Sequence, residues 1–185
     1  MDQIQVGIPY LELYRQAQLV SVCGVDLTRV PGLSTLAVRT IIGETGLDMN
    51  CWKSEKHFCS WLKLCPDNRI NGGKVLSSRA RKTRSRATAM FRLAAQSAMR
   101  SQTAIGAFIR RIKARLGAPI AINAGAHKLA QLLYRMLKFG ETYVERGQTY
   151  YEEKYQERLL RNLDRRAKEF GLQLTPCEPS TASVS

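Results

Sequence analysis

The middle of the sequence has no acidic residues. The chain has 185 residues with 29 Lys or Arg and 15 Asp or Glu, which gives a net charge of +14. Residues 68–140 hold 16 of these cations and no Asp or Glu, whereas the other 112 residues carry 13 basic and 15 acidic side chains. A solvated helix face normally mixes both signs, because like charges repel and opposite pairs stabilise neighbouring turns. The block therefore predicts a polyanionic partner. Nucleic acid is the leading candidate, because each cation near a phosphate releases counterions; the alternative is a surface that only keeps the protein soluble.

Long apolar runs are absent as well. No stretch approaches the ~20 residues that cross a bilayer, and the N-terminus carries Asp2 where a signal peptide has its basic region. The densest basic stretch has too few large apolar side chains for a membrane-surface helix. Five cysteines, an odd number, do not indicate a disulfide framework. We therefore expect a cytoplasmic protein without a membrane partner.

Helical patterning covers most of the chain and predicts an all-α fold. The expected helices span residues 10–22, 34–45, 54–64, 85–100, 104–116, 119–139 and 148–170, with glycine or proline at most of their boundaries. Residues 68–83 are expected to form an irregular, basic, glycine-containing loop. The predicted organisation is an N-terminal helix (1–24), a domain that binds nucleic acid (25–140), a C-terminal helical extension (141–174) and a disordered tail (175–185).

A turn between the first two predicted helices resembles the hairpin of a helix-hairpin-helix element. It reads V-D-L-T-R-V-P-G-L-S-T-L-A over residues 25–37, with Pro31 and Gly32 at its centre. Such a turn presents backbone N–H groups to a DNA phosphate, and glycine permits a close approach. The usual pattern has a second glycine where this chain has Ser34. An ordinary helix-to-helix turn explains the same residues equally well.

A second candidate site opens the acid-free block. Asn71, Gly72, Gly73 and Lys74 form an N-G-G-K loop that lacks the spacing of a P-loop, so nucleotide triphosphate binding is not predicted. A glycine-rich loop that leads into cations suits a nucleic-acid backbone. The cations expected to contact phosphates are Lys74, Arg79, Arg81, Lys82, Arg84 and Arg86.

Ser77 and Ser78 lie among these cations and are candidate nucleophiles. A serine needs a base, or a cationic setting that stabilises its alkoxide and the leaving phosphate. The only two histidines, His57 and His127, are remote from them in the sequence. The favoured interpretation is that the two hydroxyls contact phosphates or cap a turn.

Cysteine and histidine residues invite a zinc interpretation that their spacing does not favour. Cys51, His57, Cys59 and Cys65 follow the pattern C-x5-H-x-C-x5-C, which fits no standard zinc finger. Buried free cysteines are the simpler alternative. His127 lies in an apolar helix and is expected to be partly buried and hydrogen-bonded. No metal site is predicted in the chain.

Several segments together resemble the C-terminal transposase domain of the insertion-sequence "one-ten" family, bacterial DEDD-type transposases guided by a bridge RNA. The order and spacing of these segments hold from about residue 20 to 174. They are V-D-L-T-R-V-P-G-L (25–33), E-K-H-F-C-S-W-L-K-L-C-P (55–66), N-R-I-N-G-G-K-V-L-S-S-R (68–79), R-L-A-A-Q-S (92–97), A-R-L-G-A-P-I-A-I (114–122), A-H-K-L-A (126–130) and G-Q-T-Y-Y-E-E-K-Y (147–155).

The resemblance implies a role in DNA transposition. In the family, an N-terminal RNase-H-like domain supplies the acidic residues that bind divalent metal, and the C-terminal domain supplies a serine that attacks DNA. This chain resembles a truncated member without the acidic domain, so Mg²⁺ is expected only with that missing part and no cofactor in the chain itself. The family serine aligns with Asn71, whose amide cannot act as the nucleophile. The implied partners are DNA, a guide RNA, and a second copy of the chain or a full-length transposase.

Three functions follow from these observations. The first is DNA binding in transposition without independent catalysis. The second is an active strand-transfer enzyme that uses Ser77 or Ser78 together with a separate metal-binding domain. The third is a basic RNA-binding or scaffold protein.

Overall fold

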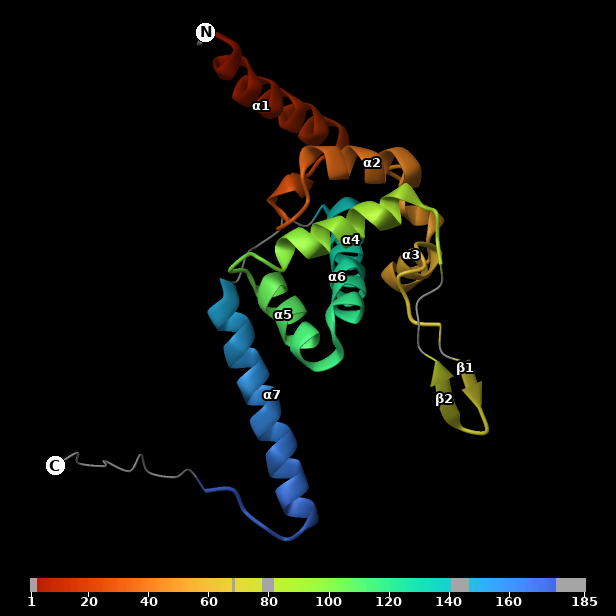
Figure 1. Cartoon of the computed structure of the whole chain (residues 1–185), viewed down its shortest axis with the longest axis vertical. Coiled ribbons are helices and arrows are strands. Elements are labelled where there is room, and N and C mark those ends of the chain that lie inside the picture. The colour runs from red at the N-terminus through yellow and green to blue at the C-terminus, as the bar shows by residue number, and fades with distance from the viewer. Residues whose placement is uncertain (1–2, 68, 78–81, 141–146, 176–185) are drawn as a thin grey trace, which may run out of the picture.

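Helices make up the body of the molecule (Figure 1). The computed structural model describes residues 3–67, 69–77, 82–140 and 147–175. Its elements are α1 (Gln3–Cys23), two short 3-10 turns (Leu27–Arg29 and Met49–Cys51), α2 (Thr35–Thr45), α3 (Glu55–Trp61), β1 (Arg69–Asn71), β2 (Lys74–Ser77), α4 (Arg86–Ala98), α5 (Ala104–Leu116), α6 (Ala118–Phe139) and α7 (Gly147–Glu169). The predicted all-α class is confirmed. The tail predicted to be disordered falls outside the described residues, apart from its first residue.

Most helices begin and end where the sequence predicts. Ser34 Oγ accepts the Ala37 amide at 3.2 Å at the start of α2, and Gly46 and Gly140 follow the ends of α2 and α6. The prediction for α3 was too long by three residues. Lys63 has φ 55°, and the amide of Leu64 turns back onto the Cys59 carbonyl at 3.0 Å, which closes the last turn early.

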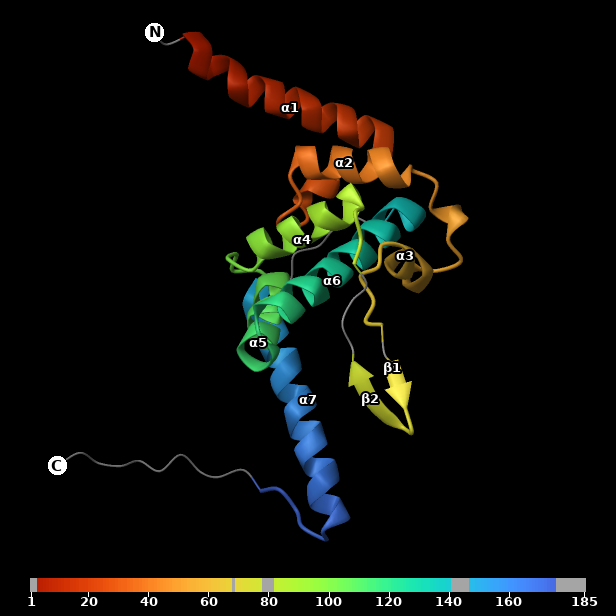
Figure 2. The same ribbon diagram turned by 45° about the vertical axis from the view of Figure 1, so that its right-hand side comes forward.

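The hydrophobic core forms around α6, which packs against α3, α4 and α5 (Figure 2). Its largest side chains come from all four helices and from the segment after α3. Those with no more than 1% of their surface exposed include Phe58, Leu62, Leu64, Phe91, Ile109, Leu129 and Leu133. Removing this apolar area from water is the main stabilisation of the body.

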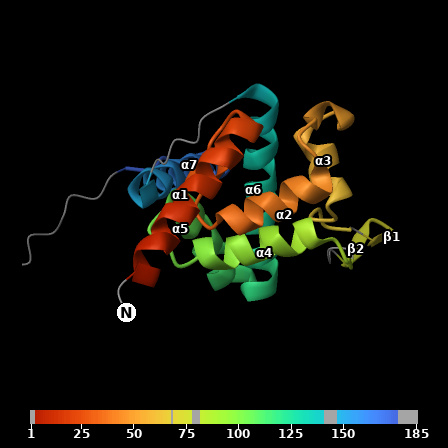
Figure 3. The same cartoon turned by 90° about the horizontal axis from the view of Figure 1, so that it is seen from above.

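Helix α4 packs between α2 and α6, as Figure 3 shows from above. Its buried surface is made largely of small side chains, so neighbouring backbones can approach closely: Ala87, Ala94, Ala95 and Ala98. The turn at Gly32 uses this space. A Cβ atom at Gly32 would lie 2.2 Å from the Ala94 carbonyl oxygen, and the residue has φ +89°. Only glycine satisfies both the contact and the backbone conformation.

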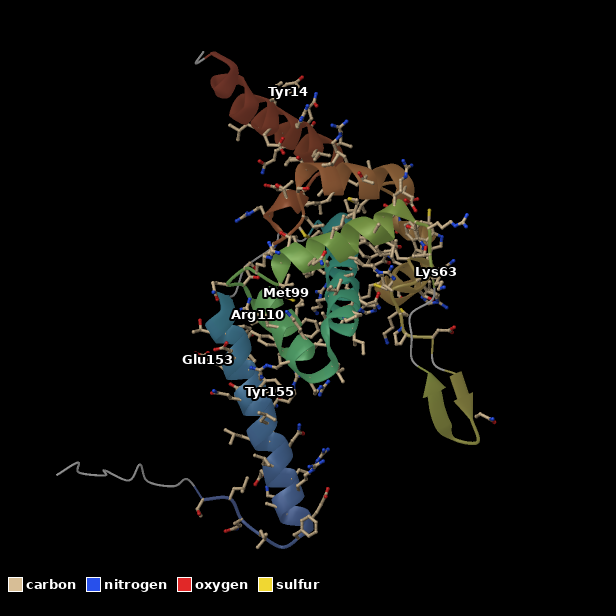
Figure 4. The ribbon with its side chains drawn as sticks, viewed as in Figure 1. Tyr14, Lys63, Met99, Arg110, Glu153 and Tyr155 are labelled. Atoms are coloured by element: carbon tan, nitrogen blue, oxygen red, sulfur yellow. The ribbon has the colours of Figure 1, made fainter. Side chains whose placement is uncertain are left out.

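Two helices extend from the body as arms, α1 at one end and α7 at the other (Figure 1). The C-terminal half of α1 is tied to the following turn, because the Gln16 amide donates to the Asp26 carboxylate at 3.0 Å and to the Thr28 hydroxyl at 2.8 Å. Tyr14 points away from the body and is 56% exposed (Figure 4). Helix α7 packs on α5 through its N-terminal half.

The turn at Gly32 makes a stability prediction. We expect Gly32→Ala to lower the free energy of unfolding by at least about 3 kcal/mol, because it combines left-handed strain with a clash against the α4 backbone. Gly140→Ala is the matched control, since Gly140 has φ +64° in the left-handed region but nothing within 4 Å of a Cβ atom. It should cost only the strain, about 1–2 kcal/mol. Urea denaturation followed by circular dichroism measures both, and equal losses would contradict the packing role of Gly32.

Candidate nucleic-acid interface

Residues 68–83, expected to be irregular, contain a β-hairpin. Strands β1 and β2 pair antiparallel, and Asn71 lies opposite Lys74 across a two-residue turn. Gly72 and Gly73 form this turn with φ +54° and +78°, values that a tight turn between two strands requires and glycine supplies. A Gly-Gly pair between two strand-like runs is a recognised hairpin signal. Here the flanking strands read R-I-N and K-V-L-S, so only the glycine pair itself pointed to this element.

The hairpin brings four of the candidate residues to one exposed tip. Asn71, Gly72 and Gly73 are exposed, and a Cβ atom at either glycine would meet nothing within 4 Å. Lys74 follows them at the start of β2. Figures 1 and 2 show the hairpin standing away from the helical body. The glycine backbone at the tip is therefore open to a ligand from outside.

The candidate nucleophile Ser77 is not at this tip. Ser77 is the last residue of β2 and lies opposite Arg69, at the end of the hairpin nearer the body. Asn71, the position aligned with the family serine, belongs to the turn at the other end. Ser78, Arg79 and Arg81 fall outside the described residues.

An extended segment between the hairpin and α4 displays three cations. Lys82, Arg84 and Arg86 are exposed and alternate with Thr83 and Ser85, which are half-buried. The alternating exposure of residues 82–86, in which Arg86 is already the first residue of α4, leaves all three cations open to solvent. The hydroxyls face the protein: Thr83 Oγ1 accepts the Ser85 amide at 3.1 Å, and Ser85 Oγ accepts the Thr88 amide at 3.1 Å.

Hydrogen bonds to Leu62 and to Glu44 fix the start of α4 and with it the position of Arg86. The buried Thr88 hydroxyl donates to the Leu62 carbonyl at 2.8 Å. Glu44, on α2, accepts the Ala87 amide through Oε2 at 2.9 Å. The hydrogen bond from Ser85, together with those from the Ala87 and Arg86 amides, keeps the pKa of Glu44 below its ordinary value. This carboxylate already satisfies a free amide at the N-terminus of α4, so the segment before α4 is the better place for a phosphate.

The turn over residues 25–37 uses its glycine to contact α4. Pro31 and Gly32 are half-buried, and Gly32 meets the Ala94 backbone as described above. At the N-terminus of α2, Ser34 caps the Ala37 amide, and the Thr35 hydroxyl donates to the Glu12 carboxylate. These contacts support the ordinary helix-to-helix turn, the alternative that the sequence left open.

The cysteine and histidine residues do not assemble into a metal site. Among the described residues, no three His, Cys, Asp or Glu side chains are placed so that they could hold a metal ion. Cys59 is fully buried and unpaired, and burial raises the pKa of its thiol to about 12. His57 Nδ1 lies 2.8 Å from the Ser54 hydroxyl on the exposed surface. The simpler interpretation of buried free cysteines thus holds for Cys59, whereas Cys65 is half-buried and Cys51 is exposed.

A groove beside α6 contains cations that the sequence analysis did not assign to a binding site. Arg92 of α4, Lys128 of α6 and Arg158 of α7 line it. Lys128 and Arg92 belong to the acid-free block, so the sequence did indicate that they face an anionic partner. Arg158 lies in a helix of balanced charge, and only the packing of α7 on α5 brings it to the groove.

Comparison with known proteins finds a similarity to a transposase family in the central part of the chain. The hairpin and the first part of the helical body, from the turn after α1 to the middle of α5, lie in a segment, residues 25–110, that matches the model of the transposase IS116/IS110/IS902 family. The match begins at the turn after α1 and ends within α5. Over these residues the chain is similar to the transposases of this family, and the similarity supports a role in transposition. No curated protein and no solved structure matches the chain.

A membrane-crossing helix was not expected. Within the ranges that the structure describes, no helix combines the length and the apolar character that a bilayer crossing requires.

The contact between Glu44 and α4 makes a pH-dependent prediction. A carboxylate whose pKa is lowered by folding stabilises the native state above its unfolded pKa and loses that effect as the pH falls through its folded pKa. Glu44→Gln should therefore lower the free energy of unfolding by about 0.5 kcal/mol at pH 7, the usual size for an exposed carboxylate at a helix N-terminus. The difference should shrink as the pH falls through the lowered folded-state pKa of Glu44. Thermal unfolding over a series of acidic pH values measures it. Glu153→Gln removes an equal charge from the exposed face of α7 (Figure 4), and an identical pH-dependent loss there would contradict the assignment.

Proposed function

We propose that this protein binds DNA during transposition through the hairpin tip and the segment over residues 82–86. The observation that carries the proposal is the exposure of three cations, Lys82, Arg84 and Arg86, over the segment that links a protruding hairpin with a Gly-Gly turn to the start of α4. Phosphate contacts of this kind supply affinity that does not depend on base sequence. The family match over residues 25–110 supports DNA as the polyanion.

The hairpin tip suits the backbone of a strand. Gly72 and Gly73 have no side chain to keep a phosphate away from their amides, and Lys74 adds a positive charge beside them. The Asn71 amide can donate a hydrogen bond to a phosphate oxygen but cannot attack phosphorus. The tip is thus a binding element, and the chain by itself carries out no strand transfer in this proposal. Lys74, Arg79 and Arg81 would add further phosphate contacts.

The domain that binds DNA comprises residues 25–140 in this proposal. Helices α5 and α6 complete the core around α4, so they belong to the same unit as the family match. The C-terminal half of α7 leaves apolar side chains exposed, namely Leu159, Leu160, Leu163 and Phe170. We infer that this arm contacts a second copy of the chain or a full-length transposase, because a helix with such a stripe is stabilised by a partner.

The salt dependence of DNA affinity tests the electrostatic contact. Duplex DNA should bind the full chain with a steep negative slope of log affinity against log salt. Replacing Lys82, Arg84 and Arg86 together by Ala should reduce that slope by roughly 2 to 3 units and weaken binding about tenfold or more near physiological salt. Fluorescence anisotropy at several salt concentrations measures both quantities.

A matched variant separates this surface from net charge. Replacing Arg161, Arg165 and Arg166 by Ala also removes three exposed cations, but from the projecting half of α7. Its slope should stay within about 1 unit of the wild-type slope. Equal losses in the two variants, or binding insensitive to salt, would overturn the proposal. Equal affinity for structured RNA and duplex DNA would favour the RNA-binding or scaffold alternative.

A covalent adduct test addresses catalysis. The strand-transfer alternative requires a bond between DNA and Ser77 or Ser78 when a full-length transposase of the family supplies the metal-binding domain. We expect no adduct on this chain, as judged by denaturing electrophoresis with labelled DNA. An adduct that Ser77→Ala or Ser78→Ala removes would establish the alternative.

A further inference from the structure

The groove beside α6 is a large hollow of the described surface and lies outside the proposed DNA contact. It has a volume of about 1380 Å³ and is lined by residues of α4, α5, α6 and α7 and of the segment after α3. Leu64 and Pro66 line the part nearest the start of the hairpin, and Tyr151 and Arg158 line the part on α7. Figures 1 and 2 show the hairpin and α7 extending from the same side of the body. The groove therefore lies between the segment that leads into the hairpin and α7.

Three cations line the groove, and no carboxylate does. Arg92, Lys128 and Arg158 come from three different helices, and the structure gives none of them an ion pair among the described residues. Arg92 is held in place, because its guanidinium donates to Asn123 Oδ1 at 3.4 Å while Asn123 Nδ2 donates to the Leu64 carbonyl at 2.9 Å. Glu55 reaches this lining through a hydrogen bond from Gln131 at 3.3 Å. Three cations against this one acid still favour an anionic ligand.

Helix α7 is anchored so that Arg158 stays at the groove. The Arg111 guanidinium of α5 stacks over Tyr155 with 3.4 Å from its carbon to the ring centre, and over Tyr151 at 5.5 Å. Phe108 meets Tyr151 edge to face at 6.2 Å. Figure 4 shows Tyr155 on the side of α7 that faces α5. Arg158 lies on the following turn of the same helix face.

The floor of the groove is apolar and accessible. Leu116 is 47% exposed and Ile120 53% exposed, and Phe108 and Tyr151 add aromatic surface. His127 supplies a polar group on this floor: the structure gives its ring no hydrogen bond among the described residues. Burial lowers the pKa of His127, so the ring is neutral at pH 7 and offers one donor and one acceptor.

We propose that this groove binds unpaired nucleotides of a nucleic-acid strand, with phosphates at Arg92, Lys128 and Arg158 and bases against the floor around Ile120. The proposal rests on the proposed nucleic-acid function and adds a second site to it. An unpaired base has an apolar face and hydrogen-bonding edges, which match the apolar floor and the His127 ring. A duplex stacks its bases internally and would leave the floor uncovered. An acidic protein helix is the competing occupant, and the test below distinguishes it.

Charge reversal tests the phosphate contacts. The probe is an oligothymidylate of about 12 nucleotides, compared with the oligouridylate of equal length and with the oligothymidylate annealed to its complement. Lys128→Glu combined with Arg158→Glu in the full chain should weaken single-strand binding at least about tenfold and leave duplex binding within about twofold. The matched control combines Arg39→Glu with Arg100→Glu, two exposed cations that do not line the groove.

The outcomes of this first experiment separate the proposals. Equal losses of single-strand affinity in the two double variants, or no loss in the groove variant, would overturn the groove site. Duplex binding that persists in either case leaves the proposed function standing. Conversely, single-strand binding that depends on the groove, without any duplex binding, would support the groove and refute the proposed duplex contact. Tighter binding of the oligouridylate would identify RNA as the source of the strand, and equal or tighter binding of the oligothymidylate would identify DNA; both support the site.

Abasic nucleotides test the floor. The wild-type chain should bind the oligothymidylate at least about fivefold more tightly than an abasic strand of equal length, because base stacking contributes to affinity. Ile120→Gln should remove most of this preference, whereas Leu93→Gln, at a position 55% exposed on α4 and outside the groove, should keep it. The absence of any base preference in the wild type would overturn the proposal. A dimer in analytical ultracentrifugation that both groove variants abolish, with single-strand affinity unchanged, would assign the groove to a protein partner instead.

Discussion

The close packing of α4 is the constraint on which the rest of the structure depends. Its alanine-rich surface admits the Gly32 turn on one side and α6 on the other, and its first turn is tied to α2 by Glu44 and to the segment after α3 by Thr88. Residues 82–85 lead directly into α4, whose first residue is Arg86. The same contacts therefore also hold the segment that carries Lys82, Arg84 and Arg86 in place. The buried face of α4 thus stabilises the fold, while the start of the same helix positions the proposed DNA contact.

The distribution of charge follows the same division. Glu12 and Glu44, which lie before the acid-free block, contact the first turns of α2 and α4. The block itself contributes small and apolar side chains to the core and leaves its cations at the surface, at the hairpin and in the groove beside α6. An anion that approaches the protein meets cations without competing carboxylates, since the neighbouring acids already serve as partners of helix ends.

The helices were predictable because their signals are local. Ser34, Ser85 and Thr103 cap the helices that follow them. Glycine ends α2, α5 and α6, as the sequence predicted. The hairpin was predicted as a loop because its strands are only three and four residues long, too short for an alternation to stand out beside a run of cations. The early end of α3 also escaped prediction, because it depends on a left-handed conformation at Lys63, a residue type that carries no such signal.

The sequence alone determined the all-α class, the positions of the helix caps and the acid-free block that indicates nucleic acid, because composition and local hydrogen bonding decide each of these. Only the tertiary structure decided that the glycine of the 25–37 turn contacts α4 and that Asn71 and Ser77 lie at opposite ends of a hairpin. It also decided that Arg158, from a helix of balanced charge, joins Arg92 and Lys128 at one groove. These relations join residues far apart in the chain or depend on pairing register, so they arise only when the helices pack and the strands pair.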